Sequence, residues 1–247
     1  MATRAARGYG QYSGTARALE RVGDRWALLI VRDLLVGPRR YGDLKASLAR
    51  IPTNILSDRL RELQESGVVR RVPSVRGGYE LTESGRALEP VVLALERWGW
   101  AMLGDRGEGE SVDADALAMS LRAAFRADAA AALPPSEYVL HVGGVREGDE
   151  GGVSLSAVVV GASLDVVAIG PGALPAPRRR SAFEPVPEAV LELELEPAQL
   201  HRLLTGDPGR LVVPTADEAL LDRFAETFRI ESAPPPAESG DAQAVPA

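Results

Sequence analysis

The sequence predicts an α+β protein in two parts, the first mainly helical with a small hairpin and the second a mixture of strands and helices. Three patterns support this prediction. Leucines recur at helical spacing in residues 53–66, a basic hairpin pattern follows them, and strand-like runs fill the second half. A glycine-rich, acidic stretch at residues 104–115 lies between the two parts and has the composition of a solvated linker. The 247 residues are enough for two modest domains, each with its own core.

Charge differs sharply between the two parts. Residues 1–104 carry 17 basic and 11 acidic side chains, a net charge of +6, whereas the remainder carries 11 basic and 24 acidic side chains, a net charge of -13. The overall charge of -7 alone would argue against a nucleic-acid partner. Its distribution makes the first part the candidate for contact with a polyanion.

The first elements lead up to a pair of short helices. Residues 1–14 contain three glycines and are predicted to form a mobile arm. Helices are then expected at 15–22, at 26–36, where the dense leucines and valines indicate a buried support, and at 41–49.

Residues 53–66 are predicted to form a second helix of the pair, with Leu56, Leu60 and Leu63 on one apolar face. Pro52 disfavours helix at the residue before it, and the Thr53 hydroxyl is expected to cap the first turn. Gly67 supplies a left-handed stop. The opposite face of this helix carries four polar side chains, Asn54, Ser57, Asp58 and Arg61.

A hairpin is predicted next, with strands at 68–72 and 79–81 and a connection marked by Pro73, Gly77 and Gly78. Helix, turn, helix and basic hairpin follow one another in the order of a winged helix-turn-helix, a DNA-reading module. Residues 84–103 are predicted to form one long helix that is more apolar than a small winged domain can cover. We expect a second subunit to cover it.

The second half is predicted to begin with an alanine-rich helix at 116–132. The run VLELELE at 190–196 alternates leucine and glutamate, which is typical of a strand with one face in water. The tail, 231–247, is too poor in apolar residues to fold. The remaining elements are expected as strands at 138–142, 153–160, 164–169 and 211–213 and as helices at 197–205 and 216–228.

Residues of about 16–103 resemble the HxlR-type family of bacterial winged-helix transcriptional regulators. The resemblance rests on the linked segments GDRWALLIVRDLLVGPRRYGDL, IPTNILSDRLRELQESGVV and YELTESGRALEPVVLALERWGW. It implies a homodimer, formed by the terminal helices of domain 15–103, that places the second helix of the pair in the major groove of double-stranded DNA, with the half-sites as an inverted repeat. Such proteins often carry a cysteine before the first helix. Here Tyr12 and Ser13 stand at that place and the chain contains no cysteine, which excludes thiol-based sensing.

Residues 116–230 resemble, by the order and lengths of their elements, the sterol-carrier-protein-like fold. Domains of that kind hold an apolar tunnel between a sheet and helices. The resemblance implies either a sensor for a hydrophobic small-molecule effector or a lobe that supports the dimer.

The candidate DNA-binding residues divide by their expected partners. Asn54, Ser57 and Arg61 are candidates for base edges. Arg59 lies beside the leucine face, so a structural salt bridge and a phosphate contact are equally open to it. The pair Arg39 and Arg40 is expected either to be solvated or to bind the DNA backbone. The full set is Arg39, Arg40, Thr53, Asn54, Ser57, Arg59, Arg61, Arg70, Arg71 and Arg76, in which the last three belong to the wing and are assigned to phosphates or the minor groove.

An enzyme is not expected from this sequence. It has two histidines, His141 and His201, no cysteine and no phosphate-binding glycine loop followed by lysine, so no metal cluster, catalytic pair or cofactor site is predicted. No signal peptide or membrane-spanning stretch is seen, and the protein is expected in the cytoplasm. The alternative function is a carrier or sensor of a hydrophobic small molecule whose winged domain mediates dimerisation or protein contacts. The basic face of residues 53–66 argues against that alternative, since a protein-contact helix would expose an apolar strip.

Overall fold

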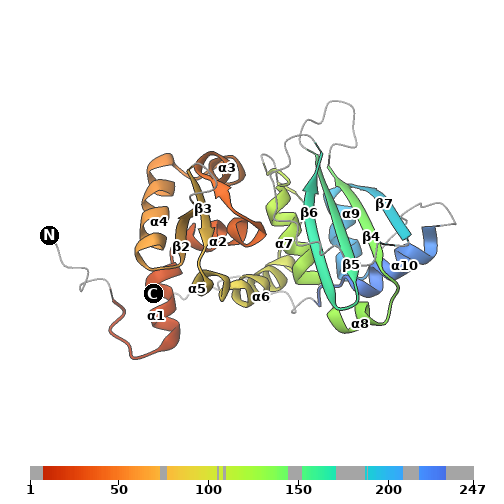
Figure 1. The fold of residues 1–247 in the computed structure, drawn as a ribbon, viewed down its shortest axis with the longest axis horizontal. Coiled ribbons are helices and arrows are strands. Elements are labelled where there is room, and N and C mark those ends of the chain that lie inside the picture. Colours follow the sequence, from red (N-terminus) through yellow and green to blue (C-terminus); the bar gives the residue numbers. More distant parts are fainter. Residues whose placement is uncertain are drawn as a thin grey trace, which may run out of the picture.

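The computed structural model describes residues 8–72, 77–104, 106–107, 110–143, 152–170, 187, 189–207 and 217–231. The chain forms two lobes that lie side by side (Figure 1). Arg76, the expected strand at 211–213 and nearly all of the expected tail lie outside the described residues. No helix in the described part of the chain is long and apolar enough to cross a membrane.

The first lobe contains six helices and three strands among its described residues. In chain order they are α1 (Gly14–Val22), α2 (Ala27–Val36), β1 (Arg39–Arg40), α3 (Tyr41–Ser47), α4 (Thr53–Glu65), β2 (Val69–Val72), β3 (Gly78–Leu81), α5 (Glu83–Arg86) and α6 (Glu89–Trp100). The strands form an antiparallel sheet in the order β1-β3-β2, so the wing has one strand more than the expected hairpin. Strand β1 is two residues long, which is too short for a periodic sequence pattern.

Helix α4 has the predicted apolar face, because Leu56, Leu60 and Leu63 are all buried. Its predicted start is wrong in one detail: Pro52 occupies the N-cap position and Thr53 is the first helical residue, so the Thr53 hydroxyl makes no capping bond. The predicted stop is confirmed. Gly67 has a φ of 74°, in the left-handed region, and lets the Val68 N–H donate to the Leu63 carbonyl at 2.9 Å.

The single helix predicted over 84–103 is two helices, α5 and α6. Pro90 lies in the first turn of α6, where a backbone N–H has no partner within the helix, so its absence costs nothing. In one continuous helix the same proline would remove a hydrogen bond. Thr82 is the N-cap of helix α5, and its side chain accepts from the Gly85 N–H at 3.1 Å. Gly85 is required here because a Cβ would lie 2.2 Å from the Val68 carbonyl oxygen.

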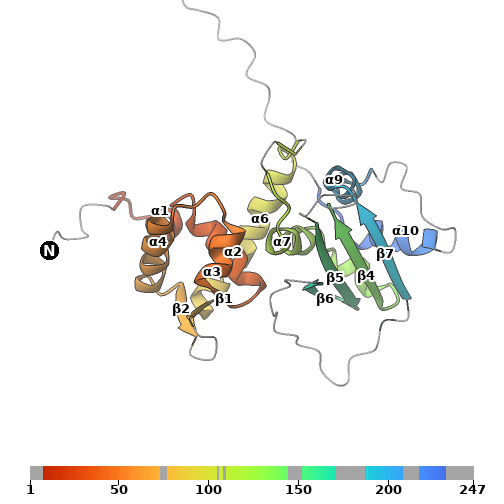
Figure 2. The same cartoon turned by 90° about the horizontal axis from the view of Figure 1, so that it is seen from above.

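The second lobe is a four-stranded sheet in the order β6-β5-β4-β7, in which β4 and β7 are parallel and the other pairs antiparallel. Helices α9 and α10 cover one face of it (Figure 2). The predicted alternation in β7 is confirmed, with Leu191, Leu193 and Leu195 buried and the intervening glutamates exposed. The elements are α7 (Ala114–Ala124), α8 (Ala127–Ala131), β4 (Ser136–Val142), β5 (Val153–Val160), β6 (Ser163–Ile169), β7 (Ala189–Leu195), α9 (Pro197–Thr205) and α10 (Glu218–Thr227).

The helix predicted at 116–132 is also divided, at Phe125 and Arg126. The break is made by the distant end of α10, where the Arg126 N–H donates to the Thr227 carbonyl at 2.8 Å and the Arg229 N–H donates to the Ala124 carbonyl at 2.7 Å. Phe125 forms an isolated bridge with Phe228. The helix therefore ends where a long-range backbone pairing replaces its own hydrogen bonds.

Helix α7 joins the two lobes into one packed unit. It packs against α2 and α6 of the first lobe and against β5 and β6 of the second, and the buried apolar residues form one continuous cluster through both. The Arg97 side chain of α6 donates to the Ala123 carbonyl at 2.8 Å, and the Trp100 and His201 rings stack with centroids 5.4 Å apart. The expected linker is thus shorter than 104–115, because Ala114 and Asp115 already belong to α7.

Candidate nucleic-acid interface

Helices α3 and α4 are held together by hydrogen bonds at the start of α4. The Tyr41 hydroxyl on α3 donates to the Thr53 carbonyl at 2.8 Å, and the Ser57 hydroxyl donates to Tyr41 Oη at 3.3 Å. The Thr53 carbonyl, at 3.1 Å from Ser57 Oγ, is a second acceptor for the same hydroxyl hydrogen. Sequence reasoning missed Tyr41, since a tyrosine at a helix start carries no distinctive spacing signal. Its hydroxyl links the start of α3 to the first turn of α4.

The outer face of α4 carries the polar side chains expected there. Thr53, Asn54, Ser57 and Arg61 are exposed, on the side of the helix away from the buried leucines. The Arg61 side chain is 64% exposed and lies 2.9 Å from the Asp58 carboxylate. An ion pair this exposed contributes little to stability, so Arg61 can exchange Asp58 for another acceptor at small cost.

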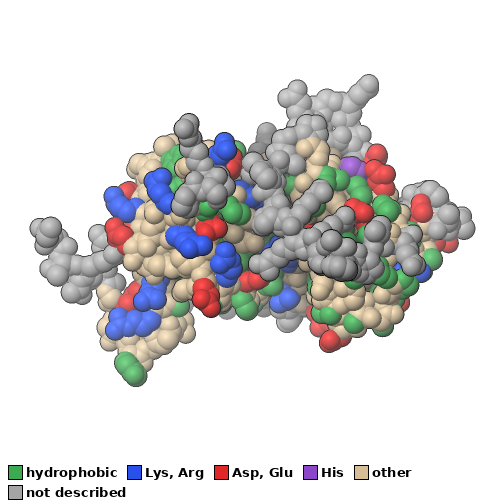
Figure 3. Space-filling view, viewed as in Figure 1, with side chains coloured by type: hydrophobic (Ala, Val, Ile, Leu, Met, Phe, Trp, Pro, Cys, Tyr) green, Lys and Arg blue, Asp and Glu red, His purple; other side chains and the backbone are tan. Residues whose placement is uncertain are grey.

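The wing presents two exposed arginines on β2. The Arg70 guanidinium contacts the Glu80 carboxylate at 2.6 Å, and the Arg71 guanidinium lies over the Tyr79 ring at 5.0 Å from its centroid. Together with Arg40 at the start of α3, which is also exposed, they form a positive surface on the first lobe. Figure 3 shows blue side chains spread over that lobe.

Arg59 is engaged inside the first lobe. Its Nη1 lies 2.6 Å from the Glu62 carboxylate and 3.5 Å from that of Asp24. Its side chain is 24% exposed, and the two ion pairs are the structural salt bridge that was one of the two roles expected for Arg59. It connects α4 to the segment that precedes α2.

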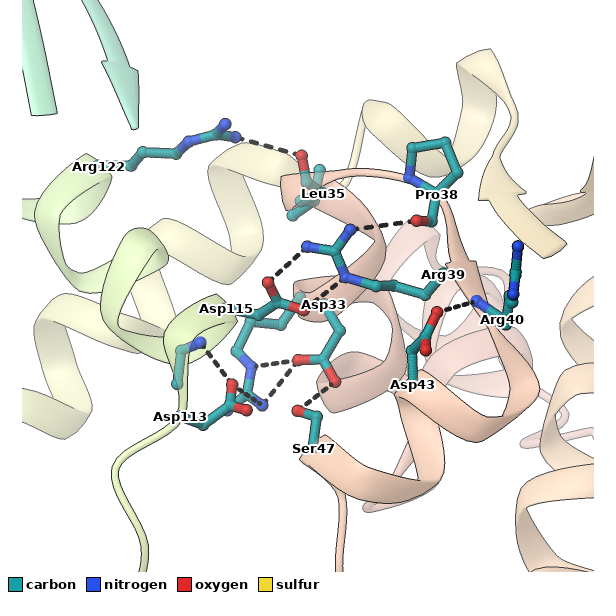
Figure 4. Close-up of polar contacts among 12 residues, drawn as sticks. Asp33, Leu35, Pro38, Arg39, Arg40, Asp43, Ser47, Asp113, Asp115 and Arg122 are labelled. Atoms are coloured by element: carbon teal, nitrogen blue, oxygen red, sulfur yellow. Dashed lines mark hydrogen bonds and ion pairs between the residues drawn. The ribbon is translucent and has the colours of Figure 1, made fainter. Parts of the chain in front are cut away.

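Arg39 corrects a prediction, because it is buried and cannot grip a DNA backbone. The residue is 2% exposed, and its Nε and Nη2 donate to the two carboxylate oxygens of Asp115 at 2.7 and 2.5 Å (Figure 4). Its Nη1 donates to the Pro38 carbonyl at 3.1 Å. The neighbouring Arg40 points outward, so one residue of the pair is buried and the other is exposed to solvent.

A second buried charge lies beside this pair. The Asp33 side chain on α2 is fully buried, accepts from the Arg32 guanidinium at 2.9 Å and accepts from the Ser47 hydroxyl on α3 at 2.8 Å. Burial, partly offset by Arg32, raises the pKa of Asp33 to about 6. Arg32 also lies 3.9 Å from Asp113, the N-cap residue of α7, so the cluster links the helix-turn-helix to the second lobe.

The raised pKa of Asp33 leads us to expect that the stability of the fold depends on pH. Because its folded-state pKa exceeds the ordinary value of 3.8, its stabilising contribution is largest below about pH 4 and is lost as the pH rises through 6. The reference is Asp33→Asn, whose side chain cannot titrate. The difference in the free energy of unfolding, wild type minus variant, should fall by about 2 kcal/mol from pH 4 to pH 7. Urea unfolding of both proteins at pH 4, 5.5 and 7 measures this difference, and a constant difference would contradict it.

His141, one of the two histidines of the second lobe, bridges three strands. His141 on β4 contacts Ser154 Oγ on β5 through Nδ1 at 2.7 Å and Glu192 Oε1 on β7 through Nε2 at 2.8 Å. The Glu192 side chain is 69% exposed. A surface cross-strand contact of this kind ties neighbouring strands together and adds little stability. No cluster of metal-ligating side chains occurs within the described ranges.

The fold and the surface together define a winged helix-turn-helix DNA-binding protein, and comparison with known proteins identifies the family. Residues 21–106 match the HxlR-like helix-turn-helix family. YvaP of Bacillus subtilis, an uncharacterized HTH-type transcriptional regulator, is 38% identical over 86 residues, which cover 33% of this chain and 80% of YvaP. The chain therefore belongs to the HxlR-like helix-turn-helix family of transcriptional regulators.

Two further proteins are similar to parts of the chain. Rv3095 of Mycobacterium tuberculosis, also an uncharacterized HTH-type transcriptional regulator, is 48% identical over 87 residues, or 34% of this chain and 54% of its own length. This chain thus spans about half the length of that relative. The solved structure of quinone-bound YodB from B. subtilis is 32% identical, covers 34% of this chain and 93% of its own, and has a TM-score of 0.32.

Proposed function

We propose that the protein is a dimeric, cytoplasmic transcriptional regulator that reads an inverted repeat in double-stranded DNA. The observation that carries this proposal is the exposed polar face of α4, clamped by Tyr41 and flanked by the basic wing, in a family of helix-turn-helix regulators. Asn54, Ser57 and Arg61 would contact base edges in the major groove. Phosphate contacts would come from Arg40, Thr53, Arg70, Arg71 and Arg76.

The dimer would form through the exposed apolar stripe of α6. Val91, Leu95 and Trp98 on α6 and Met102, two residues past its end, follow one another at spacings of four, three and four residues and are 43–57% exposed, with Leu19 of α1 also 44% exposed. Such a stripe on one helix face is typical of a subunit interface. A two-fold axis there would place the two copies of α4 about 34–36 Å apart, to match successive major grooves on one face of DNA.

The second lobe would serve the regulator as a sterol-carrier-like domain that senses a small molecule or supports the dimer. Its support is the arrangement of helices on one face of a mixed sheet and the buried apolar cluster beneath them. That cluster is filled by the Tyr138, Phe224 and Phe228 rings, whose centroids lie 4.8–5.7 Å apart.

Selection of bound genome fragments by the purified full-length protein tests the proposal. We expect an inverted repeat bound at least ~10³-fold more tightly than random DNA at about 0.15 M salt. Uniform weak binding would contradict sequence-specific regulation by the protein alone.

The selected site then distinguishes base contacts from phosphate contacts. Arg61→Ala should weaken binding to the selected site about tenfold or more while changing random-DNA binding less. Arg71→Ala should weaken both equally and reduce the slope of log K against log salt by about 1. Arg202→Ala, an exposed arginine on α9 of the second lobe, is the matched control and should change neither.

A further inference from the structure

A cavity of about 810 Å³ lies at the junction of the two lobes. Its walls come from the end of α2 and the turn after it, from β3, from helices α5, α6 and α7, and from strands β5 and β6. The apolar part of the lining includes Leu34, Leu35, Leu93, Phe125 and Val160. A volume of this size lies in the range that small-molecule sites occupy, about 300–1,000 Å³.

Arg122 of α7 supplies the most buried positive charge of this cavity, with its side chain 24% exposed. Its Nη1 donates to the Leu35 carbonyl at 3.2 Å and lies 3.5 Å from the Glu89 carboxylate. Figure 4 shows this nitrogen on the Leu35 carbonyl and the rest of the guanidinium turned away from it. Among the described residues Nε and Nη2 have no hydrogen-bond partner, so the guanidinium retains donors for an incoming acceptor.

The acidic side chains of the cavity do not satisfy those donors. Glu80 is held by Arg70 at 2.6 Å, and Asp165 on β6 is only partly buried. Glu89 reaches Arg122 through one long contact and is itself 41% exposed, so it can return to water. A ligand carboxylate in its place could form the planar, two-bond pair that a guanidinium favours, in a less hydrated setting. Arg86, which also lines the cavity, adds a second positive charge.

We propose that this junction cavity binds an amphipathic carboxylate, with the apolar body against Leu34, Leu93 and Phe125 and the carboxylate on Arg122 in place of Glu89. The site lies between the lobes and not between the sheet and the helices of the second lobe. The cavity would be the effector site of the regulator. Only the expected effect of the ligand on DNA binding rests on the proposed function. Binding itself can be measured without DNA.

The position of the cavity connects it to the helix-turn-helix. The residue that Arg122 contacts, Leu35, is followed by Val36, Gly37 and Pro38, all of which line the cavity, and then by Arg39 in β1. Helix α3 begins directly after β1. A ligand that touches this turn therefore contacts the segment that sets the position of α3. Its contacts would differ between two positions of α3, and such a difference is what a change in DNA affinity requires.

Three naphthalene compounds with one ring system and different end groups test the ligand class by titration calorimetry on the full-length protein. They are 2-naphthylacetate, 2-naphthaleneethanol and 2-(2-naphthyl)ethylamine. We expect the acetate to bind most tightly, and Arg122→Gln to weaken its binding about tenfold or more while leaving the alcohol unaffected. Glu89→Gln should strengthen acetate binding about threefold, because it removes a competing carboxylate. Arg126→Gln, two residues beyond the end of α7, is the control and should change nothing.

A second variant fills the cavity without touching a charge. Ser163 is an exposed residue of β6 that lines the cavity, so Ser163→Trp should abolish acetate binding while the unfolding midpoint stays near that of the wild type. Tighter binding of the amine than of the acetate, or acetate binding that is indifferent to both Arg122→Gln and Ser163→Trp, would overturn the assignment. Failure of the wild type to bind DNA specifically would overturn the proposed function instead and leave the acetate results as they stand.

Discussion

Replacement of Arg39 by alanine is expected to lower the free energy of unfolding by about 3–5 kcal/mol. The substitution removes the guanidinium that holds both oxygens of Asp115 and leaves that carboxylate, in a residue 5% exposed, without its counterion. Arg40→Ala is the matched control: it removes the same side chain one residue later, from an exposed position, and should change stability by less than about 0.5 kcal/mol. Urea unfolding at pH 7 measures both.

The pair itself is expected to be replaceable by apolar groups. Arg39→Met combined with Asp115→Leu should recover most of the stability lost in either single variant, because no buried charge is left unpaired. A double variant as unstable as the two single variants together would show that the charges act independently, and a fully stable Arg39→Ala would contradict the buried pair altogether. DNA affinity gives a second readout, since Arg40→Ala should weaken binding without affecting stability.

Replacement of Trp98 by glutamate is expected to raise the dissociation constant of the dimer at least about 100-fold. Trp98 is the most exposed side chain of the α6 stripe, and a buried aromatic at the centre of an interface often contributes 2 kcal/mol or more. A carboxylate in its place would also be desolvated on association. Sedimentation equilibrium at micromolar concentration should find a dimer for the wild type and a monomer for the variant, and affinity for the inverted repeat should fall with it.

The matched control for this experiment is Val190→Glu. Val190 on β7 is 55% exposed, similar to Trp98, but it lies in the second lobe, away from α6. The control should remain dimeric. A monomeric wild type, or a Trp98→Glu variant that stays dimeric, would contradict the use of this stripe as the interface.

Local sequence patterns were sufficient wherever burial repeats along one element. The leucines of α4 and the alternation of β7 identify both elements and their buried faces, because the period of apolar residues reflects one environment along the whole segment. The start of α6 could also have been found from Pro90, since a proline marks a helix start better than a helix interior.

Contacts between distant residues account for what the sequence did not predict. The break after Ala124 depends on the backbone of Thr227, about a hundred residues further on. The burial of Arg39 depends on Asp115, and nothing in the sequence distinguishes Arg39 from the exposed Arg40 beside it. Arg122 is an ordinary helix residue by spacing, and only the packing of two lobes brings it to the Leu35 carbonyl.

The pairing of Arg39 with Asp115 sets an order of events during synthesis. Arg39 precedes its counterion by 76 residues, so the ribosome adds those residues over about 4–15 s at rates of about 5–20 residues per second. During that interval the nascent first lobe cannot bury the Arg39 guanidinium without leaving it uncompensated. We therefore expect the buried environment of Arg39 to form only after α7, the first helix of the second lobe, has been made.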